Sequence, residues 1–132
     1  MPCPLFLPGS LLGGTALAGS ASAAPLGALF GGVCGADPGF DIPESLLKHG
    51  CNAGYARGEC PRAASVDLDA LRFRIKSHTQ GIIEVAWSKE RDHHPVAVGT
   101  IRLAEMPGTN DALELQARAC AAVYLRITGA TW

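Results

Sequence analysis

Leu71-Arg72-Phe73-Arg74-Ile75-Lys76 is the most regular stretch of this 132-residue chain. Apolar and cationic residues alternate strictly along it, which places the apolar side chains on one face of an extended strand and the cations on the other. A strand of this kind needs a core on one side and tolerates solvent on the other. The stretch therefore predicts a sheet with one covered face.

Two further strands are expected directly after it. Residues 78–81 supply a turn that ends in glycine, and residues 83–88 alternate in the same way. Residues 91–95 form a second loop, and residues 96–103 read as a third strand with Gly99 as a bulge. The inward-facing residues of this third strand are then Val96, Val98, Ile101 and Leu103. The three strands predict an antiparallel meander.

Helical signals lie on either side of these strands. Asp111 and Glu114 resemble an N-terminal capping pair for a helix that runs to about Arg126. Earlier, Pro43 and Gly50 have the residue types of the first position and the stop of a short helix. We therefore expect an α+β fold. It comprises a three-stranded antiparallel meander packed on a C-terminal helix, preceded by a Gly/Ala/Pro-rich arm and by the short helix with a cysteine loop.

The N-terminal part differs in composition from the rest. The first 47 residues contain no lysine or arginine, and their only charged residues are Asp37, Asp41 and Glu44. We expect residues 1–36 to be a flexible apolar arm and residues 37–132 to be a single small α+β domain. The uncovered face of the sheet would then need this arm or a partner.

Part of this arm imitates a targeting segment. Residues 11–24 end in small residues, as the cleavage region of a secretory signal does, but no basic segment precedes them. Residues 11–30 have the length of a membrane helix, yet they are rich in glycine and contain Pro25. We expect a cytoplasmic protein that does not enter a membrane, with export as the alternative.

The charge pattern gives little reason to expect a polyanionic partner. The formal net charge is −1 at pH 7. Arg72, Arg74 and Lys76 share one strand face, Arg102 can join them, and Glu84 on the neighbouring strand is placed to pair with them. No exposed aromatic residue is interleaved with these cations. We therefore do not expect nucleic acid as a partner, whereas an unidentified protein partner stays open.

Five cysteines carry whatever chemistry the chain has. Cys120 lies on the apolar stripe of the last helix and is expected to be a buried hydrophobe. Cys3, Cys34, Cys51 and Cys60 are separated by 30, 16 and 8 residues, without the paired spacing of a zinc ribbon. Soft thiolates select zinc or an iron–sulfur cluster, and His49 is a substitute ligand. The expected metal ligands are Cys51, Cys60, Cys34, Cys3 and His49.

Several interpretations of these thiols stay open. Lys48 and Arg57 are close in sequence and can neutralise a thiolate cluster. The first interpretation is a structural metal-binding accessory or interaction module. The second is an exported, disulfide-stapled binding domain, and a third leaves the thiols inert or redox-labile. A cysteine-nucleophile enzyme needs a base, and His93 and His94 are expected to lie in a solvated loop instead. No catalytic or nucleotide-binding signature is present, so we expect a non-enzymatic role.

The cysteine loop also carries a resemblance. Residues 51–62, which contain the core Gly54-Tyr55-Ala56-Arg57-Gly58, resemble small uncharacterised bacterial proteins with a cysteine-flanked loop. More loosely, they resemble proteins with zinc- or iron-chelating cysteine clusters, although the crowded cysteine run of that family is missing. The resemblance implies a bacterial protein and favours metal at Cys51 and Cys60, and it implies no activity.

Overall fold

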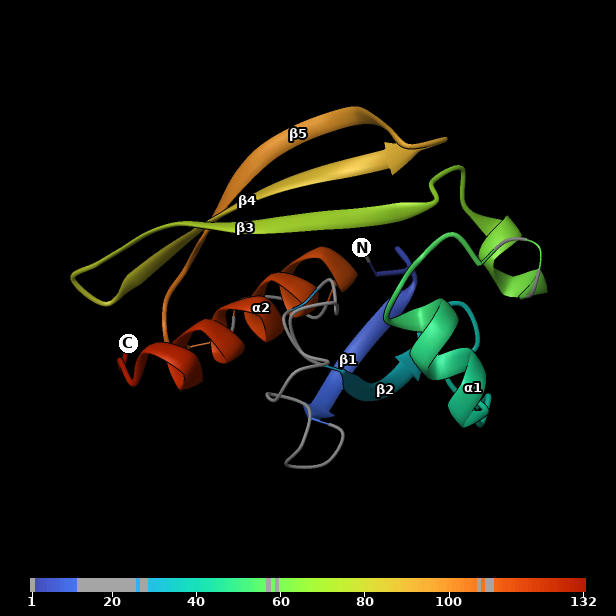
Figure 1. The fold of residues 1–132 in the computed structure, drawn as a ribbon, viewed down its shortest axis with the longest axis horizontal. Helices are drawn as coiled ribbons and strands as arrows, with labels where there is room; N and C mark the ends of the chain where they lie inside the picture. The colour runs from blue at the N-terminus through green and yellow to red at the C-terminus, as the bar shows by residue number, and fades with distance from the viewer. Residues whose placement is uncertain are drawn as a thin grey trace.

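The largest element is a three-stranded antiparallel sheet in the order β3-β4-β5 (Figure 1). The computed structural model describes residues 2–11, 26, 29–56, 58, 60–106, 108 and 111–132. Within them, β3 spans Ala70–Thr79, β4 spans Ile82–Arg91 and β5 spans His94–Leu103. The predicted meander and α+β class are confirmed.

Two tight turns join the three strands. Gln80 and Gly81 have φ angles of 52° and 77°, and Asp92 and His93 have φ angles of 52° and 64°. Positive φ at both central residues is the geometry that matches the twist of a two-residue hairpin. The second connection consists of residues 92–93 alone and is shorter than the predicted loop 91–95, because His94 already belongs to β5.

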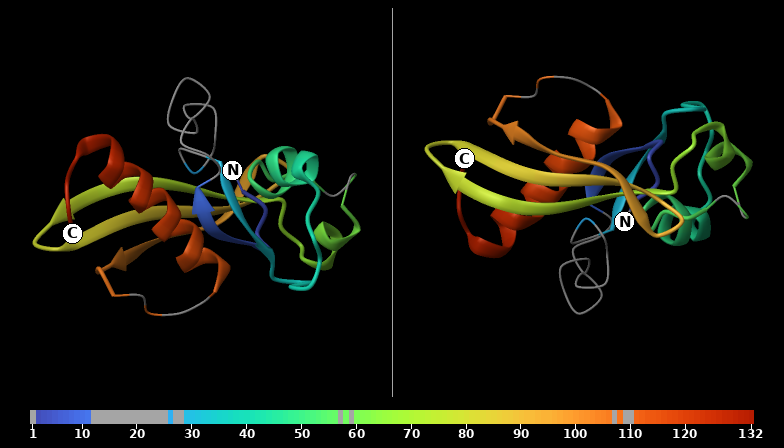
Figure 2. Two further views of the ribbon diagram at one scale, coloured as in Figure 1. Left: turned by 90° about the horizontal axis from the view of Figure 1, so that it is seen from below. Right: turned by 90° about the horizontal axis from the view of Figure 1, so that it is seen from above.

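Helix α2 (Ala112–Thr128) covers one face of the sheet (Figure 2). The Asp111 side chain accepts a hydrogen bond of 2.8 Å from the Glu114 amide, as the sequence predicts, and Gly129 ends the helix with a φ of 71°. Buried apolar side chains from both layers meet in the core: Leu71, Phe73, Ile83, Val85, Leu103, Ala117, Ala121 and Val123.

The expected bulge at Gly99 is wrong. Gly99 pairs in regular register with Trp87, and the shift between β4 and β5 lies instead at Lys89 and Glu90. A β-carbon at Gly99 would lie 2.7 Å from Cε2 of Trp87, so glycine is required because the indole ring lies over it. Because no bulge at Gly99 shifts the alternation of side chains along β5, Val98 points away from the core and is 72% exposed. Val96 is also exposed, so both valines were assigned to the wrong face.

The described parts of residues 1–36 form two paired strands and contribute to the core. Strand β1 (Phe6–Leu11) pairs antiparallel with β2 (Phe30–Cys34), and β1 packs against α2. Phe6, Leu26 and Phe30 are buried in the same core as the sheet. These aromatic and aliphatic side chains gain enough burial to fix the segment.

The run that imitates a targeting signal lies mostly outside the described residues, which omit 12–25 and 27–28. Among the helices that the structure describes, none is long and apolar enough to cross a membrane.

The short helix extends beyond its predicted end. Helix α1 (Glu44–Leu46) continues into a π-helical turn, η3 (Leu47–Cys51), and a 3₁₀ turn, η4 (Pro61–Ser65), follows. Gly50 does not stop this helix. A β-carbon there would lie 2.8 Å from Leu46 and 3.2 Å from Ala56, so glycine allows close packing inside the last turn.

Candidate functional site

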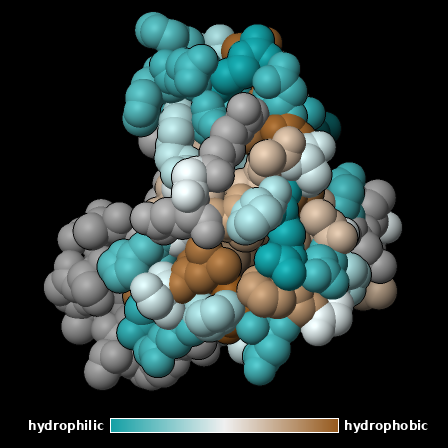
Figure 3. All heavy atoms as spheres, turned by 90° about the vertical axis from the view of Figure 1, so that its right-hand side faces the viewer, coloured by the Kyte–Doolittle hydropathy of each residue, from teal (hydrophilic) through white to brown (hydrophobic). Residues whose placement is uncertain are grey.

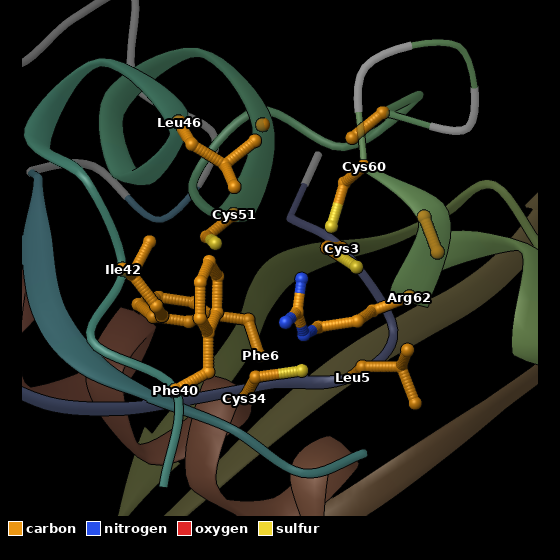
Figure 4. Close-up of a pocket in the computed structure, with 13 residues that line it drawn as sticks. Cys3, Leu5, Phe6, Cys34, Phe40, Ile42, Leu46, Cys51, Cys60 and Arg62 are labelled. Carbon is orange, nitrogen blue, oxygen red and sulfur yellow. The ribbon is translucent and has the colours of Figure 1, made fainter. Parts of the chain in front are cut away.

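Four cysteines from four separate segments line one small cavity (Figure 4). Cys3 precedes β1, Cys34 ends β2, Cys51 ends η3 and Cys60 precedes η4. The cavity has a volume of about 20 Å³, which suffices for about one water molecule or one small ion. The structure thus brings together the four thiols that the sequence singled out.

Backbone hydrogen bonds fix the position of these cysteines. The Cys3 amide donates to the Cys51 carbonyl at 3.0 Å, which joins the N-terminal segment to the end of η3. The Cys60 amide donates to the Ala56 carbonyl at 2.7 Å, and the Cys34 carbonyl accepts from the Asp37 amide at 3.2 Å. The thiols are therefore carried on anchored backbone.

Two buried amide side chains strengthen this anchoring. Asn52 is 1% exposed and exchanges hydrogen bonds of 2.9 Å with the backbone amide and carbonyl of Phe30. Gln116 on α2 donates to the carbonyls of Cys3 and Phe6, each at 2.8 Å. Sequence reasoning missed both residues. Asn52 follows Cys51 directly, but no local pattern indicates that its partner lies on β2.

Arg62 places a positive charge at the edge of the cavity. Its Nε donates to Oδ2 of Asp37 at 3.0 Å, and its Cζ lies 3.6 Å from the centroid of the Phe40 ring. The hydrogen bond to Asp37 is the largest cause that raises the pKa of Arg62, and the nearby Cys60 thiol adds to the rise. The guanidinium can offset negative charge on nearby thiolates.

The cations expected in this role are placed differently. Lys48 forms an ion pair of 2.8 Å with Glu44, and neither residue lines the cavity. Arg57 lies outside the described residues. His49, the predicted substitute ligand, is exposed on η3 and is not part of the cavity wall.

Burial makes two of the thiols weak acids. It raises the pKa of Cys51 from an ordinary 9.0 to about 12, and the neighbouring thiols of Cys3, Cys60 and Cys34 add to the rise. Burial also raises the pKa of Cys3. Both thiols are therefore protonated at neutral pH in the observed conformation, and any metal that binds them must displace protons.

The four cysteines line the cavity, but their sulfur atoms are not arranged around a common point as the ligands of a metal ion are. Within the described part of the chain, no group of three or more histidine, cysteine or acidic side chains is arranged to hold a metal ion. All five cysteines are free. Metal binding at these residues stays a prediction that requires the thiol side chains to rotate inward.

A second polar cluster ties the cysteine loop to the sheet. The Tyr55 hydroxyl donates to Oε1 of buried Glu90 at 3.1 Å and accepts from the His93 amide at 2.9 Å, while the two rings stack 4.3 Å apart. Arg72 donates from Nε to the other oxygen of Glu90 at 2.8 Å. His93 is exposed although its ring packs on Tyr55, and His94 is exposed as well. The cluster holds the loop in place.

Comparisons with known proteins add no relative: no protein-family model, curated protein or solved structure matches this chain.

Proposed function

We propose that the chain is a structural metal-binding module, with Cys3, Cys34, Cys51 and Cys60 as the ligands of one ion. The observation that carries the proposal is the shared cavity of about 20 Å³. Four cysteines spread over residues 3–60 have no local reason to gather around one cavity. Four thiolates are the ligand set of structural zinc sites.

Cavity size favours a single zinc ion over an iron–sulfur cluster. A cluster adds several iron and sulfide atoms between the cysteine sulfurs, and the cavity has room for about one small species. Zinc needs its sulfur ligands only about 2.3 Å from the metal, so the thiols would rotate inward. Arg62 at the cavity edge would reduce the net negative charge of the site.

The proposed role is structural because the surrounding elements are small. Strands β1 and β2 form a two-stranded sheet, and α1, η3 and η4 contain three to five residues each. Elements of this length are marginal alone. A metal that joins the four segments would add its binding free energy to folding. In this proposal the protein is cytoplasmic, where thiols stay reduced.

Elemental analysis of protein purified without added metal tests the proposal. We expect one zinc per chain, lost when all four ligand cysteines are changed to serine and retained in Cys120→Ser. Cys120 is the matched control because it lies on α2, away from the cavity. Zinc and iron both far below one per chain in the unmodified protein would contradict the proposal.

A second candidate is a disulfide-stapled binding domain. The observation that favours it is that Cys3 and Cys60, from segments far apart in the sequence, line the same small cavity, where each thiol can find a partner. In this case the mass of the purified chain falls by two protons for each cysteine pair, and chelators change nothing. The intact mass before and after reduction separates the two candidates.

A further inference from the structure

The outer face of the sheet β3-β4-β5, opposite α2, carries two rows of side chains in register. Arg72, Ser88 and Val98 form the first row, and Arg74, Ala86 and Thr100 form the second. Neighbours along a strand alternate between faces, so Trp87 and Gly99 belong to the inner face. The two rows therefore define one continuous surface across all three strands.

This surface is hollowed into an open trough of about 390 Å³. The cause lies in the sequence of the central strand, because Ala86 and Ser88 are small while longer side chains rise on both neighbouring strands. Its volume lies in the range of sites that hold small ligands or short segments. We name these six residues the outer trough: Arg72, Arg74, Ala86, Ser88, Val98 and Thr100.

The outer trough is cationic on one wall and apolar on the other. Arg74 on β3 is exposed, and no ion pair of Arg74 occurs within the described part of the chain. The outer-face carboxylate of the next row, Glu84, lies opposite Arg102 and accepts from Ser77 at 3.3 Å. On the other side, the buried carboxylate of Glu90 pairs with Arg72 at 2.8 Å, and the Arg72 side chain stays 60% exposed. No acidic residue belongs to the two rows themselves, so two arginines against this one carboxylate leave the trough positive, and it favours an anion.

The wall of the trough formed by β5 carries an apolar side chain that is exposed to solvent. Val98 on β5 is 72% exposed and touches the trough. The end of the molecule at which the sheet lies is otherwise mostly hydrophilic (Figure 3). An occupant that offers both a negative charge and an apolar side chain matches this pair of walls.

The spacing of the cations and the lack of aromatic side chains in the two outer rows decide between a peptide and a nucleic acid as the occupant. Arg72 and Arg74 are two positions apart on one strand, about 7 Å, which is also the repeat of same-face side chains in an extended peptide. Single-stranded nucleic acid is held chiefly by stacking on aromatic rings. Phe73 and Trp87 also border the trough, but the alternation along the strands assigns both to the inner face, so neither outer row offers an aromatic side chain. An extended acidic peptide therefore fits better than a nucleic acid.

We propose that the outer trough is a docking surface for an extended segment of a partner protein in which acidic and apolar residues alternate. Its carboxylates face the arginine wall, and its apolar side chain lies against Val98. This surface is independent of the cysteine cavity, so either proposal can fail alone.

Fluorescence anisotropy at low ionic strength tests this proposal with the full chain. The probe is a fluorescein-labelled peptide of alternating glutamate and valine. We expect saturable binding that Arg74→Glu weakens about fivefold or more, since one attraction is replaced by a repulsion. The matched reversal Arg126→Glu, at an exposed position in the last turn of α2, changes binding less than twofold.

Two further probes test whether binding depends on the charge and on the chemical class of the occupant. A peptide of alternating lysine and valine should bind the Arg74→Glu variant better than the unmodified protein. Labelled oligothymidine should bind less tightly than the glutamate peptide. The proposal is overturned by no saturable binding of the glutamate peptide, by equal effects of the two reversals, or by tighter binding of oligothymidine.

Discussion

Replacing Cys51 by serine should remove most of the zinc affinity while leaving the fold intact. Structural zinc sites bind with roughly 10–16 kcal/mol, so one of four thiolates accounts for about 3 kcal/mol. That corresponds to a loss of about a hundredfold in affinity. Serine keeps the size of the side chain, and the 3.0 Å bond from the Cys3 amide uses the Cys51 backbone carbonyl, which the change leaves in place.

Competition titration with a chromogenic chelator at pH 7.5 measures this change, and circular dichroism checks the fold. Cys120→Ser is the control, because this thiol lies outside the cavity and should not alter affinity. The raised pKa of Cys51 adds a second expectation, namely that the zinc affinity of the unmodified protein increases with pH. If Cys51→Ser and Cys120→Ser bound zinc equally well, Cys51 would not be a ligand.

Two substitutions test the fold, and the dependence of stability on pH tests the buried thiol of Cys51. Gly99→Ala should destabilise the protein by about 1–3 kcal/mol, because the methyl group meets Trp87, whereas Gly39→Ala, which meets no atom within 4 Å, should be near neutral in thermal unfolding. Asp111→Ala removes the cap of α2 and should cost about 1 kcal/mol in urea unfolding; an unchanged midpoint would argue against the cap. The metal-free protein should lose stability as pH rises above about 9, because the unfolded chain then releases the proton that folded Cys51 keeps until about pH 12; Cys51→Ala should lessen this loss.

The meander could be predicted from sequence because its signals are local. Alternation in residues 71–76 and 83–88 fixes which side chains face the core, and Asp111 with Glu114 marks the start of α2. The face of the sheet to which the side chains of β5 point could not be predicted in the same way. Gly99 reads as a bulge, and only its cross-strand neighbour Trp87 shows that it makes room for a ring.

The N-terminal strands were missed because their partners are distant in sequence. Strand β1 contains proline, glycine and serine, and its pairing partner β2 begins only after residues 12–29, which carry no strand signal. Local propensity is a weak guide where tertiary contacts fix a strand. The four cysteines were identified by residue type alone, whereas Arg62, Asn52 and Gln116 require the fold to be known.

Extended X-ray absorption at the zinc edge of the loaded protein tests the central claim most directly. The account predicts four sulfur neighbours at about 2.3 Å from a single zinc and no second metal nearby. The same spectrum from Cys51→Ser should lose one sulfur and gain an oxygen or nitrogen neighbour. A first shell made only of oxygen and nitrogen, or one with a single sulfur, would contradict the account.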